Sequence, residues 1–233
     1  MENPRGRRLR IQALVFDFDG LILDTETPLF ASWNEIFSEC GFAVSEADWA
    51  EMLGSESDPP TPYELLERHV GRPVDRGALR QRRLAREEAL LASEPLLPGV
   101  TSILAEAQAR RLLAAVASSS EREWVERHLG RFGLRSAFRI VVCAEDVART
   151  KPSPDLYLEA VRRLGVAPGE AIAFEDSQKG AAAARAAGLF CVSVPNRMTR
   201  HRRALEADLT VSSLDEIALA DLIRVAESRR GAD

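Results

Sequence analysis

Short apolar runs alternate with helical patterns from about residue 95 onward, and this alternation constrains the fold most. The apolar runs lie at 112–117, 138–143, 171–174 and 190–194, with a weaker one at 209–211. Helical patterns fill the gaps, notably at 155–164 and 179–187. Alternating strands and helices indicate a parallel sheet that is covered by helices on both faces. An earlier run at 11–16 is apolar without alternation, as expected of a strand buried on both faces, so we assign it to the same sheet.

Residues 25–93 differ from the rest, because they show helical spacing and no run with the period of a strand. Thr27 followed by Pro28 predicts a helix start, and Gly41 predicts the end of that helix. The residues TPYE at 61–64 form a capping-box pattern, and 75–93 is predicted to be a further helix. We therefore expect an α/β protein with a Rossmann-like parallel-sheet core, residues 1–24 and 94–233, and an inserted α-helical cap domain, residues 25–93.

The composition is that of a soluble globular protein and excludes several classes. The net charge of −5 argues against a nucleic-acid partner, which normally binds a basic chain. No apolar run approaches the roughly 18 residues of a membrane span, and the N-terminus does not resemble a secretory signal, so no membrane partner is expected. Cys40, Cys143 and Cys191 fit neither a disulfide framework nor a zinc site. A cytoplasmic protein, monomeric or weakly dimeric, is the simplest expectation.

Polar residues follow four of the predicted strands at their carboxyl ends, where parallel α/β sheets bind ligands. These residues are Asp17 and Asp19, Ser118 and Ser119, Glu145 and Asp146 with Lys151 shortly after, and Glu175 and Asp176. Side chains at positions i and i+2 project to the same side, so Asp17 and Asp19 are expected to lie together. With Asp176 they form an oxygen-rich cluster that suits Mg²⁺. No histidine lies at a strand end, which disfavours a metal with nitrogen ligands.

The remaining strand-end groups fit a phosphate. Ser118 offers a hydroxyl, and the amides of Ser119 and Ser120 are expected at a helix start, which favours anions. Lys151 adds a positive charge, and Pro154 can begin the helix that follows. Only two of the 31 basic residues are lysines, so Lys151 stands out against an arginine-rich background. A planar guanidinium is a poor substitute for an ammonium that must reach a carboxylate and a phosphoryl oxygen together.

Each of these motifs has an ordinary structural explanation when taken alone. The residues DFDG suit a turn, a run of serines suits a helix N-cap, and an acidic pair suits a helix N-terminus. A lysine before proline is usually a solvated charge in a loop. All four explanations would have to coincide at four strand ends, so the joint interpretation as a phosphate and metal site is favoured.

At this point the sequence resembles a known family. The segments DFDG at 17–20, VAS at 116–118, KPSPD at 151–155 and FEDS at 174–177 are similar to the four ordered motifs of the haloacid dehalogenase superfamily. The helical segment 25–93 resembles the cap of the subgroup that contains β-phosphoglucomutase and phosphoglycolate phosphatase. The resemblance implies a phosphatase that hydrolyses a small phosphorylated metabolite, a sugar phosphate by preference, through an aspartyl-phosphate intermediate.

The resemblance also implies roles for individual residues. Asp17 is implied as the nucleophile, Asp19 as the general acid and base, and Lys151 as a third catalytic group. Ser118, Ser119 and Lys151 are implied to bind the phosphoryl oxygens. Mg²⁺ is the implied cofactor, and its implied ligands are Asp17, Asp19 through its backbone carbonyl, Asp176 and Glu175.

The presence or absence of single residues distinguishes the other reactions that the family catalyses. A dehalogenase lacks the second aspartate, which is present here as Asp19, and phosphonate hydrolysis needs a cap lysine, which 25–93 does not contain. A hexose-phosphate mutase like β-phosphoglucomutase stays open. Its cap histidine aligns near Leu29, and the loop 54–58 has no arginine, so simple hydrolysis is favoured. A binding or regulatory module without catalysis is the third alternative. Arg122 could touch the substrate, but a solvent-facing arginine is favoured, and Lys179 is likewise expected to face solvent. The role of the loop 54–62 is left open.

Overall fold

The chain forms two compact units. In this computed structural model, residues 10–54, 60–200 and 206–230 are described. The first unit contains Met1–Ile22, Leu96–Asn196 and Leu205–Asp233, and the second contains Leu23–Pro95 and Arg197–Ala204. We describe each unit by itself.

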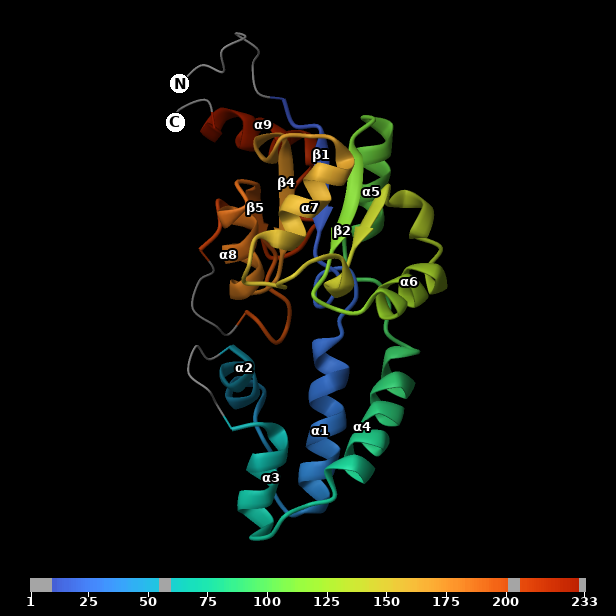
Figure 1. Cartoon of the computed structure of the whole chain (residues 1–233), viewed down its shortest axis with the longest axis vertical. Helices are drawn as coiled ribbons and strands as arrows, with labels where there is room; N and C mark the ends of the chain where they lie inside the picture. Colours follow the sequence, from blue (N-terminus) through green and yellow to red (C-terminus); the bar gives the residue numbers. More distant parts are fainter. Residues whose placement is uncertain (1–9, 55–59, 201–205, 231–233) are drawn as a thin grey trace. The chain divides into compact units, whose positions relative to one another are not determined.

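The first unit is built on a parallel sheet of six strands (Figure 1). The strands lie in the order β3-β2-β1-β4-β5-β6, and every pair of neighbours is parallel. Their bounds are β1 Ala13–Phe16, β2 Leu113–Ala117, β3 Ile140–Val142, β4 Ala171–Glu175, β5 Phe190–Ser193 and β6 Leu209–Thr210. The predicted α/β class and the assignment of the first strand to this sheet are confirmed.

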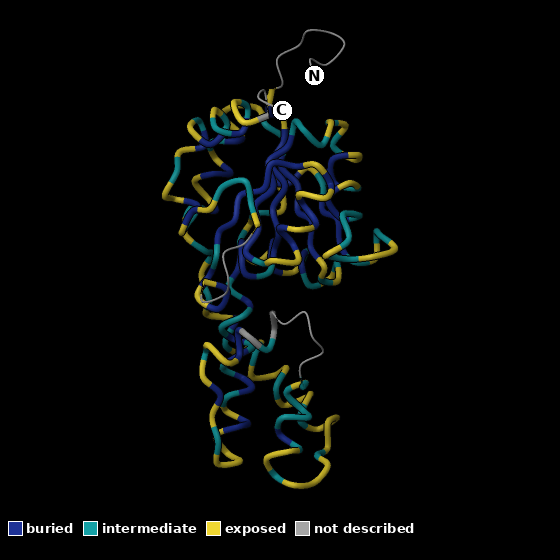
Figure 2. Tube along the Cα trace, turned by 90° about the vertical axis from the view of Figure 1, so that its left-hand side faces the viewer, coloured by how far each residue is buried: buried dark blue, intermediate teal, exposed yellow. Residues whose placement is uncertain are grey.

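The central strands are buried on both faces, which explains why their residues are apolar without alternation (Figure 2). Ala13 and Val15 of β1 belong to one core cluster with helices α7, Asp155–Leu164, and α8, Gln178–Ala186. Phe16, which points to the opposite face of the strand, is also fully buried and stacks on Phe174 with ring centroids 4.8 Å apart. Helix α5, Val100–Ala109, contacts β2 and lies on the other side of the sheet from α7 (Figure 1).

The remaining elements of this unit are short connections and two helices. Helix α6 spans Arg122–Arg131 and follows β2, and helix α9 spans Leu219–Arg230 and contacts α5. The described residues of this unit also form three 3₁₀ turns: η1 Arg135–Ala137, η2 Ala144–Asp146 and η3 Pro168–Glu170. None of the described helices is both long and apolar enough to cross a membrane.

The second unit is helical. Its helices are α1 Glu26–Glu39, α2 Glu46–Gly54, α3 Pro62–Val70 and α4 Arg76–Leu91. They enclose an apolar cluster of buried residues, which consists of Phe30, Trp33, Ile36, Phe37, Val44, Trp49, Leu66 and Met198. The capping box predicted at 61–64 is present, because the Thr61 side chain accepts from the Glu64 amide and the Glu64 carboxylate accepts from Thr61.

The predicted start of the first cap helix is wrong by two residues. Thr25, not Thr27, is the N-cap of α1, so Pro28 is the third helical residue. The Asp24 carboxylate accepts hydrogen bonds from both the amide and the hydroxyl of Thr27, at 2.9 and 2.7 Å. Asp24 thereby provides a hydrogen-bond acceptor at the start of the helix, a role that was predicted for the Thr27 side chain.

The second unit also includes a segment that the sequence places in the core domain. Residues Arg197–Ala204 group with the helical unit, although they follow the fifth strand. Met198 is fully buried in the helical cluster, and Arg197 forms an ion pair with Glu46 of α2. Of this segment, 201–204 lie outside the described residues, as does most of the loop 54–62.

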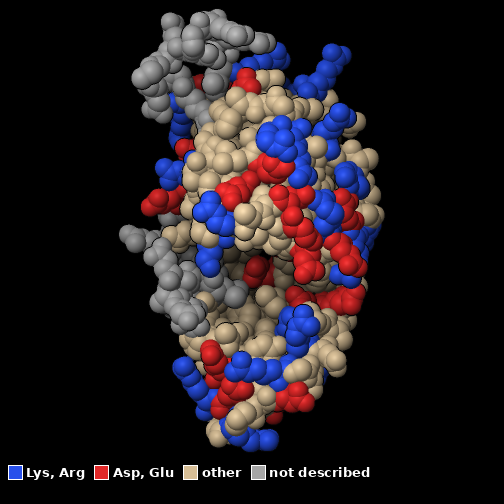
Figure 3. Space-filling view, viewed as in Figure 1, with Lys and Arg blue, Asp and Glu red and all other residues tan. Residues whose placement is uncertain are grey.

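Charges of both signs are interspersed on the face shown in Figure 3. On the helical unit, Arg86 of α4 pairs with Glu35 of α1 at 2.8 Å, and Arg82 of α4 pairs with Glu39 of α1. All four side chains are about half exposed, so solvent screens these pairs and they contribute little to stability.

Candidate active site

The carboxyl ends of β1 and β4 bring three carboxylates together. The strands pair in register, with Phe16 opposite Phe174, and the Asp17 amide donates to the Phe174 carbonyl at 3.0 Å. This register places Asp17 beside Glu175 and Asp176. One carboxylate oxygen from each of the three residues lies within 4.8 Å of the others, and all three residues are buried.

Lys151 lies among these carboxylates. Its Nζ is 2.6 Å from Asp17 Oδ1 and 2.7 Å from Glu175 Oε1, and only 6% of its side chain is exposed. The two carboxylates raise the pKa of Lys151 against the opposing effect of burial, so the ammonium stays charged. The structure therefore brings the predicted Lys151 to the predicted Asp17 and Glu175.

Three residues without a predicted role hold these groups in place, and of them only Ser177 belongs to a quoted motif. The Tyr157 hydroxyl donates to Glu175 Oε1, and the Ser177 hydroxyl donates to Glu175 Oε2 at 3.2 Å. The Asn196 amide donates to Asp176 Oδ2 at 2.7 Å and to the Gly20 carbonyl at 3.0 Å. Asn196 was within reach of sequence reasoning, because it lies just beyond the end of the fifth strand. Tyr157 gave no such signal, since it lies inside a helix.

Gly20 shows why a glycine follows the two aspartates. Its φ is +77°, and a Cβ there would lie 2.4 Å from Asp176 Oδ2 and 2.6 Å from the Asn196 side-chain nitrogen. A larger residue is excluded both by the backbone conformation and by the carboxylate packed against it.

The Asp17 and Asp19 carboxylates have different hydrogen-bond and ion-pair partners. The strand ends at Phe16, and the chain then turns, with the Ile22 amide bonded to the Phe18 carbonyl at 2.9 Å, so the alternation of an extended strand no longer holds. The Asp19 carboxylate is absent from the three-residue acidic cluster of the described chain. A metal-ligand role for Asp19 thus rests on its backbone carbonyl, as the resemblance implies.

The Asp19 carboxylate instead meets the end of β2 and helix α6. Its Oδ2 accepts from the Ser120 hydroxyl at 2.6 Å and lies 3.3 Å from the Ser118 hydroxyl, and its Oδ1 accepts from Trp124 Nε1 at 2.9 Å. Ser118 is fully buried, whereas Ser119 is exposed in the loop before α6. Helix α6 begins at Arg122, so Ser119 and Ser120 precede it by more than one residue.

The acidic pair after β3 serves another purpose. The Glu145 carboxylate accepts from the Arg122 amide at 2.9 Å, at the start of α6. Asp146 accepts from the Cys143 amide at 2.8 Å and pairs with the guanidinium groups of Arg163 and Arg122, and these contacts lower its pKa against the opposing effect of burial. Arg122, for which a solvent-facing role was favoured, is therefore part of an ion-pair network that ties α6 and α7 to the end of β3.

The charge balance of the buried cluster favours a cation. Three carboxylates face one ammonium, and burial together with Glu175 raises the pKa of Asp17 to about 8 despite Lys151. The described residues alone therefore do not neutralise the site. The donors are all oxygens, which suit a hard divalent cation, and these residues fit such an ion.

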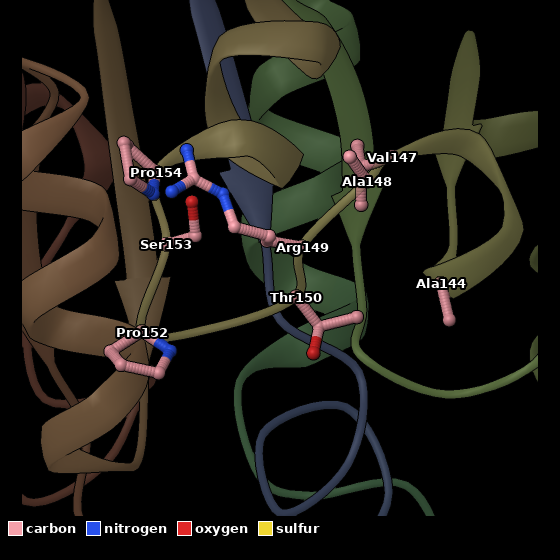
Figure 4. Close-up of a pocket in the computed structure, with 8 residues that line it drawn as sticks. All are labelled: Ala144, Val147, Ala148, Arg149, Thr150, Pro152, Ser153 and Pro154. Atoms are coloured by element: carbon pink, nitrogen blue, oxygen red, sulfur yellow. The ribbon is translucent and has the colours of Figure 1, made fainter.

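A pocket of about 700 Å³ is lined by residues that flank Lys151 in the sequence, and none of the residues of the acidic cluster lines it (Figure 4). Its lining consists of Ala144, Val147, Ala148, Arg149, Thr150, Pro152, Ser153 and Pro154, on both sides of Lys151. None of these is a predicted catalytic, phosphate-binding or metal-binding residue. The carboxylates and the ammonium that could bind a metal ion and a phosphate lie in the acidic cluster, not in this pocket.

The sequence of this chain is similar to those of known proteins. The family profile of the haloacid dehalogenase-like hydrolases matches residues 14–194, so the chain belongs to that family, as its four motifs predict. The chain is 41% identical over 213 residues to YhcW of Bacillus subtilis (strain 168), named as a candidate phosphatase, with 91% of this chain and 96% of the relative covered.

Two further relatives point the same way. Hexitol phosphatase B of Escherichia coli (strain K12) is 31% identical over 238 residues, covering 96% of this chain and 100% of the relative. The crystal structure of CbbY from Rhodobacter sphaeroides in complex with phosphate matches with a TM-score of 0.68 and 32% identity, over 88% of this chain and 96% of that chain. The protein is an enzyme of the phosphatase class, which confirms the predicted phosphoric monoester hydrolase.

Proposed function

We propose that the protein is a Mg²⁺-dependent phosphatase that hydrolyses a small phosphorylated metabolite, a sugar phosphate by preference, through an aspartyl-phosphate. The observation that carries the proposal is the Lys151 ammonium between Asp17 and Glu175, at 2.6 and 2.7 Å. It provides a positive charge next to the carboxylate that must approach a phosphoryl anion. Hexitol phosphatase B supports a polyol or sugar phosphate as the substrate class.

The first step transfers the phosphoryl group to Asp17. Asp17 Oδ1 accepts from Lys151 and from the Phe18 amide, so we assign the attack to Oδ2. The new bond joins this oxygen to phosphorus as the bond from phosphorus to the ester oxygen breaks. Asp19 gives its proton to the departing alkoxide. Ser118, Ser119 and Lys151 bind the oxygens of the transferred group.

The second step releases inorganic phosphate. Asp19, now ionised, takes a proton from water as the water oxygen attacks phosphorus, and the bond to Asp17 breaks. When bound, Mg²⁺ neutralises negative charge on the transferring phosphoryl group. The residues that hold it in this proposal are Asp17, Asp176 and Glu175, with the Asp19 carbonyl. Glu175 already contacts Lys151, so its contribution through a water is also consistent with the proposal.

Replacement of Asp17 tests the proposed function. With Mg²⁺ present, wild-type enzyme is expected to release phosphate from at least one member of a panel of sugar phosphates, phosphoglycolate, nucleotides and p-nitrophenyl phosphate. Asp17→Asn should lower the rate by about 10³-fold or more, as expected when a nucleophile is removed. Asp221→Asn, an exposed carboxylate paired with Arg224, is the matched control and should keep wild-type activity. Wild-type inactivity over the whole panel would contradict the proposal and favour a non-catalytic binding module.

The mutase alternative is separated by its product. A hexose-phosphate mutase interconverts isomers of glucose phosphate and releases almost no inorganic phosphate, whereas a phosphatase releases phosphate in proportion to the substrate consumed. Phosphorus NMR of β-glucose 1-phosphate with enzyme, Mg²⁺ and a trace of glucose bisphosphate distinguishes the two outcomes.

A further inference from the structure

Both oxygens of the Asp19 carboxylate are hydrogen-bonded by side chains of the segment from the end of β2 into α6. Oδ1 accepts from Trp124 Nε1 at 2.9 Å. Oδ2 accepts from Ser120 at 2.6 Å and from Ser118 at 3.3 Å. The Trp124 contact has the length of a good N–H to oxygen bond, and it joins residues 105 positions apart.

The indole ring of Trp124 is itself held by its neighbours. His128, one turn further along α6, meets it edge-on with ring centroids 4.5 Å apart. The Arg127 guanidinium lies 5.3 Å from the centroid of the same ring. Trp124 is half-buried, and its Nε1 is therefore presented to Asp19 by a ring of fixed orientation.

The two sides of Asp19 differ in chemistry. An indole Nε1–H donates and never accepts, so the oxygen that it contacts must be an acceptor. A serine hydroxyl donates or accepts, and it tolerates either protonation state of the carboxyl. The carbonyl oxygen of a carboxylic acid is a better acceptor than its hydroxyl oxygen, so the Trp124 contact on Oδ1 favours a proton on Oδ2, the oxygen beside Ser118 and Ser120.

We propose that Trp124 is a positioning residue that fixes the Asp19 carboxyl through Oδ1, so that its transferable proton resides on Oδ2. The inference rests on the proposed function, in which Ser118 binds the phosphoryl group and Asp19 protonates the leaving oxygen. Substrate then takes the hydrogen bond of Ser118, while Trp124 and Ser120 keep Asp19 in place. The Oδ2–H bond breaks, a bond from hydrogen to the leaving oxygen forms, and the electrons of the broken ester bond stay on that oxygen.

Trp124→Phe tests the inference, because it keeps the aromatic ring and removes the N–H group. The readout is kcat/KM for two esters, which reports steps up to the first phosphoryl transfer. An alkoxide leaves a sugar phosphate only with a proton, whereas p-nitrophenolate leaves without one. General acid catalysis supplies about 10²–10⁴-fold, so loss of orientation is expected to lower kcat/KM for the sugar phosphate about tenfold. The value for p-nitrophenyl phosphate should change less than about twofold, because that step needs no general acid.

Further variants separate positioning from packing. Ser120→Ala should shift the ratio of the two kcat/KM values in the same direction, and Ser120→Thr, which keeps the hydroxyl, should restore it. Arg127→Gln removes the cation beside the ring but leaves Nε1, and it should keep the wild-type ratio. The Ser120 pair keeps the test valid if Trp124→Phe folds poorly, and the melting temperature of each variant is measured alongside.

Two outcomes overturn the inference. One is an equal loss for both esters in Trp124→Phe, which indicates a packing role alone. The other is an unchanged ratio in both Trp124→Phe and Ser120→Ala. In either case wild-type enzyme still hydrolyses both esters, and the proposed function stands. If wild-type enzyme hydrolyses neither ester nor any other member of the panel, the proposed function fails and the inference fails with it.

Discussion

At the scale of single residues, the site is governed by an excess of buried negative charge. Asp17, Glu175 and Asp176 share one ammonium, and the pKa of Asp17 is raised to about 8, first by burial and then by Glu175. In the unfolded chain this carboxyl has its ordinary pKa of 3.8. Without a cation, the folded protein keeps a proton that the unfolded chain has lost. Asp17 therefore favours the folded state at low pH, and this contribution is lost as the pH rises from about 4 to about 8.

A divalent cation should reverse this loss, which gives a testable pH dependence. If Mg²⁺ binds the ionised carboxylates as proposed, it displaces the proton of Asp17, so its apparent affinity is expected to rise up to about tenfold per pH unit below pH 8. Thermal unfolding with Mg²⁺ titrated at pH 6, 7 and 8 measures this effect. The increase in melting temperature at a fixed Mg²⁺ concentration should be largest at pH 8.

Two variants serve as controls for the metal titration. Asp17→Asn should remove most of the pH dependence, because the titrating group is gone, while Asp221→Asn should leave it unchanged. Equal apparent affinities at the three pH values in the wild-type protein would show that Asp17 does not bind the cation in its ionised form.

At the scale of elements, helix α8 begins against the site. Its N-cap Ser177 accepts from the Gly180 amide at 3.1 Å, and the same hydroxyl donates to Glu175. A Cβ on Gly180 would lie 2.0 Å from the Glu175 carboxylate. Glu175 is held by Lys151, Tyr157 and Ser177, so it has little freedom to move away. The close approach of this helix to Glu175 therefore requires glycine.

Gly180→Ala tests this contact, with Gly130→Ala as the matched control in α6. The added methyl group at position 180 is expected to lower the free energy of unfolding by about 1–3 kcal/mol and to reduce phosphatase activity, since Glu175 must shift. No atom lies within 4 Å of a Cβ built on Gly130, so alanine there should be neutral or stabilise by up to about 1 kcal/mol. Urea denaturation measures both. Similar values for the two variants would argue against the clash.

At the scale of the whole molecule, the chain returns to the helical unit after β5. Asn196 bonds to Asp176 in the first unit, and the next two residues belong to the second. Met198 is fully buried in the cluster of the helical unit, with Trp33 and Trp49 among its members. A simple insertion after the first strand has only two connections to the core, so this segment adds a link that the sequence did not predict.

Met198→Ala should therefore destabilise the helical unit, even though Met198 lies far along the chain from its helices. Truncation of a fully buried methionine is expected to cost about 2–5 kcal/mol. Met52→Ala, at a half-buried position of the same cluster, is the control and should cost clearly less. Thermal unfolding followed by circular dichroism measures both. An effect of Met198→Ala no greater than that of Met52→Ala would contradict the assigned packing.

Local patterns predicted much of this protein, for identifiable reasons. Apolar runs without alternation located the buried strands, because both faces of a parallel sheet must be apolar. The capping box at Thr61 was correct, since its hydrogen bonds lie within four residues. The helix start at Thr27 was wrong, because the neighbouring Asp24 bonds to Thr27 and Thr25 takes the N-cap position. Helix α2 lies in the segment that was predicted to be helical, but its bounds were not predicted.

The sequence by itself determined the fold class, the family and the order of the strand-end motifs, because these depend on residue types at neighbouring positions. Only the tertiary structure decided which partners the side chains of these motifs contact. Asp17 joins Lys151 and Glu175, whereas Asp19, two residues later, turns to Ser120 and Trp124. Contacts between residues more than a hundred positions apart depend on strand register and helix placement, and no local spacing specifies them.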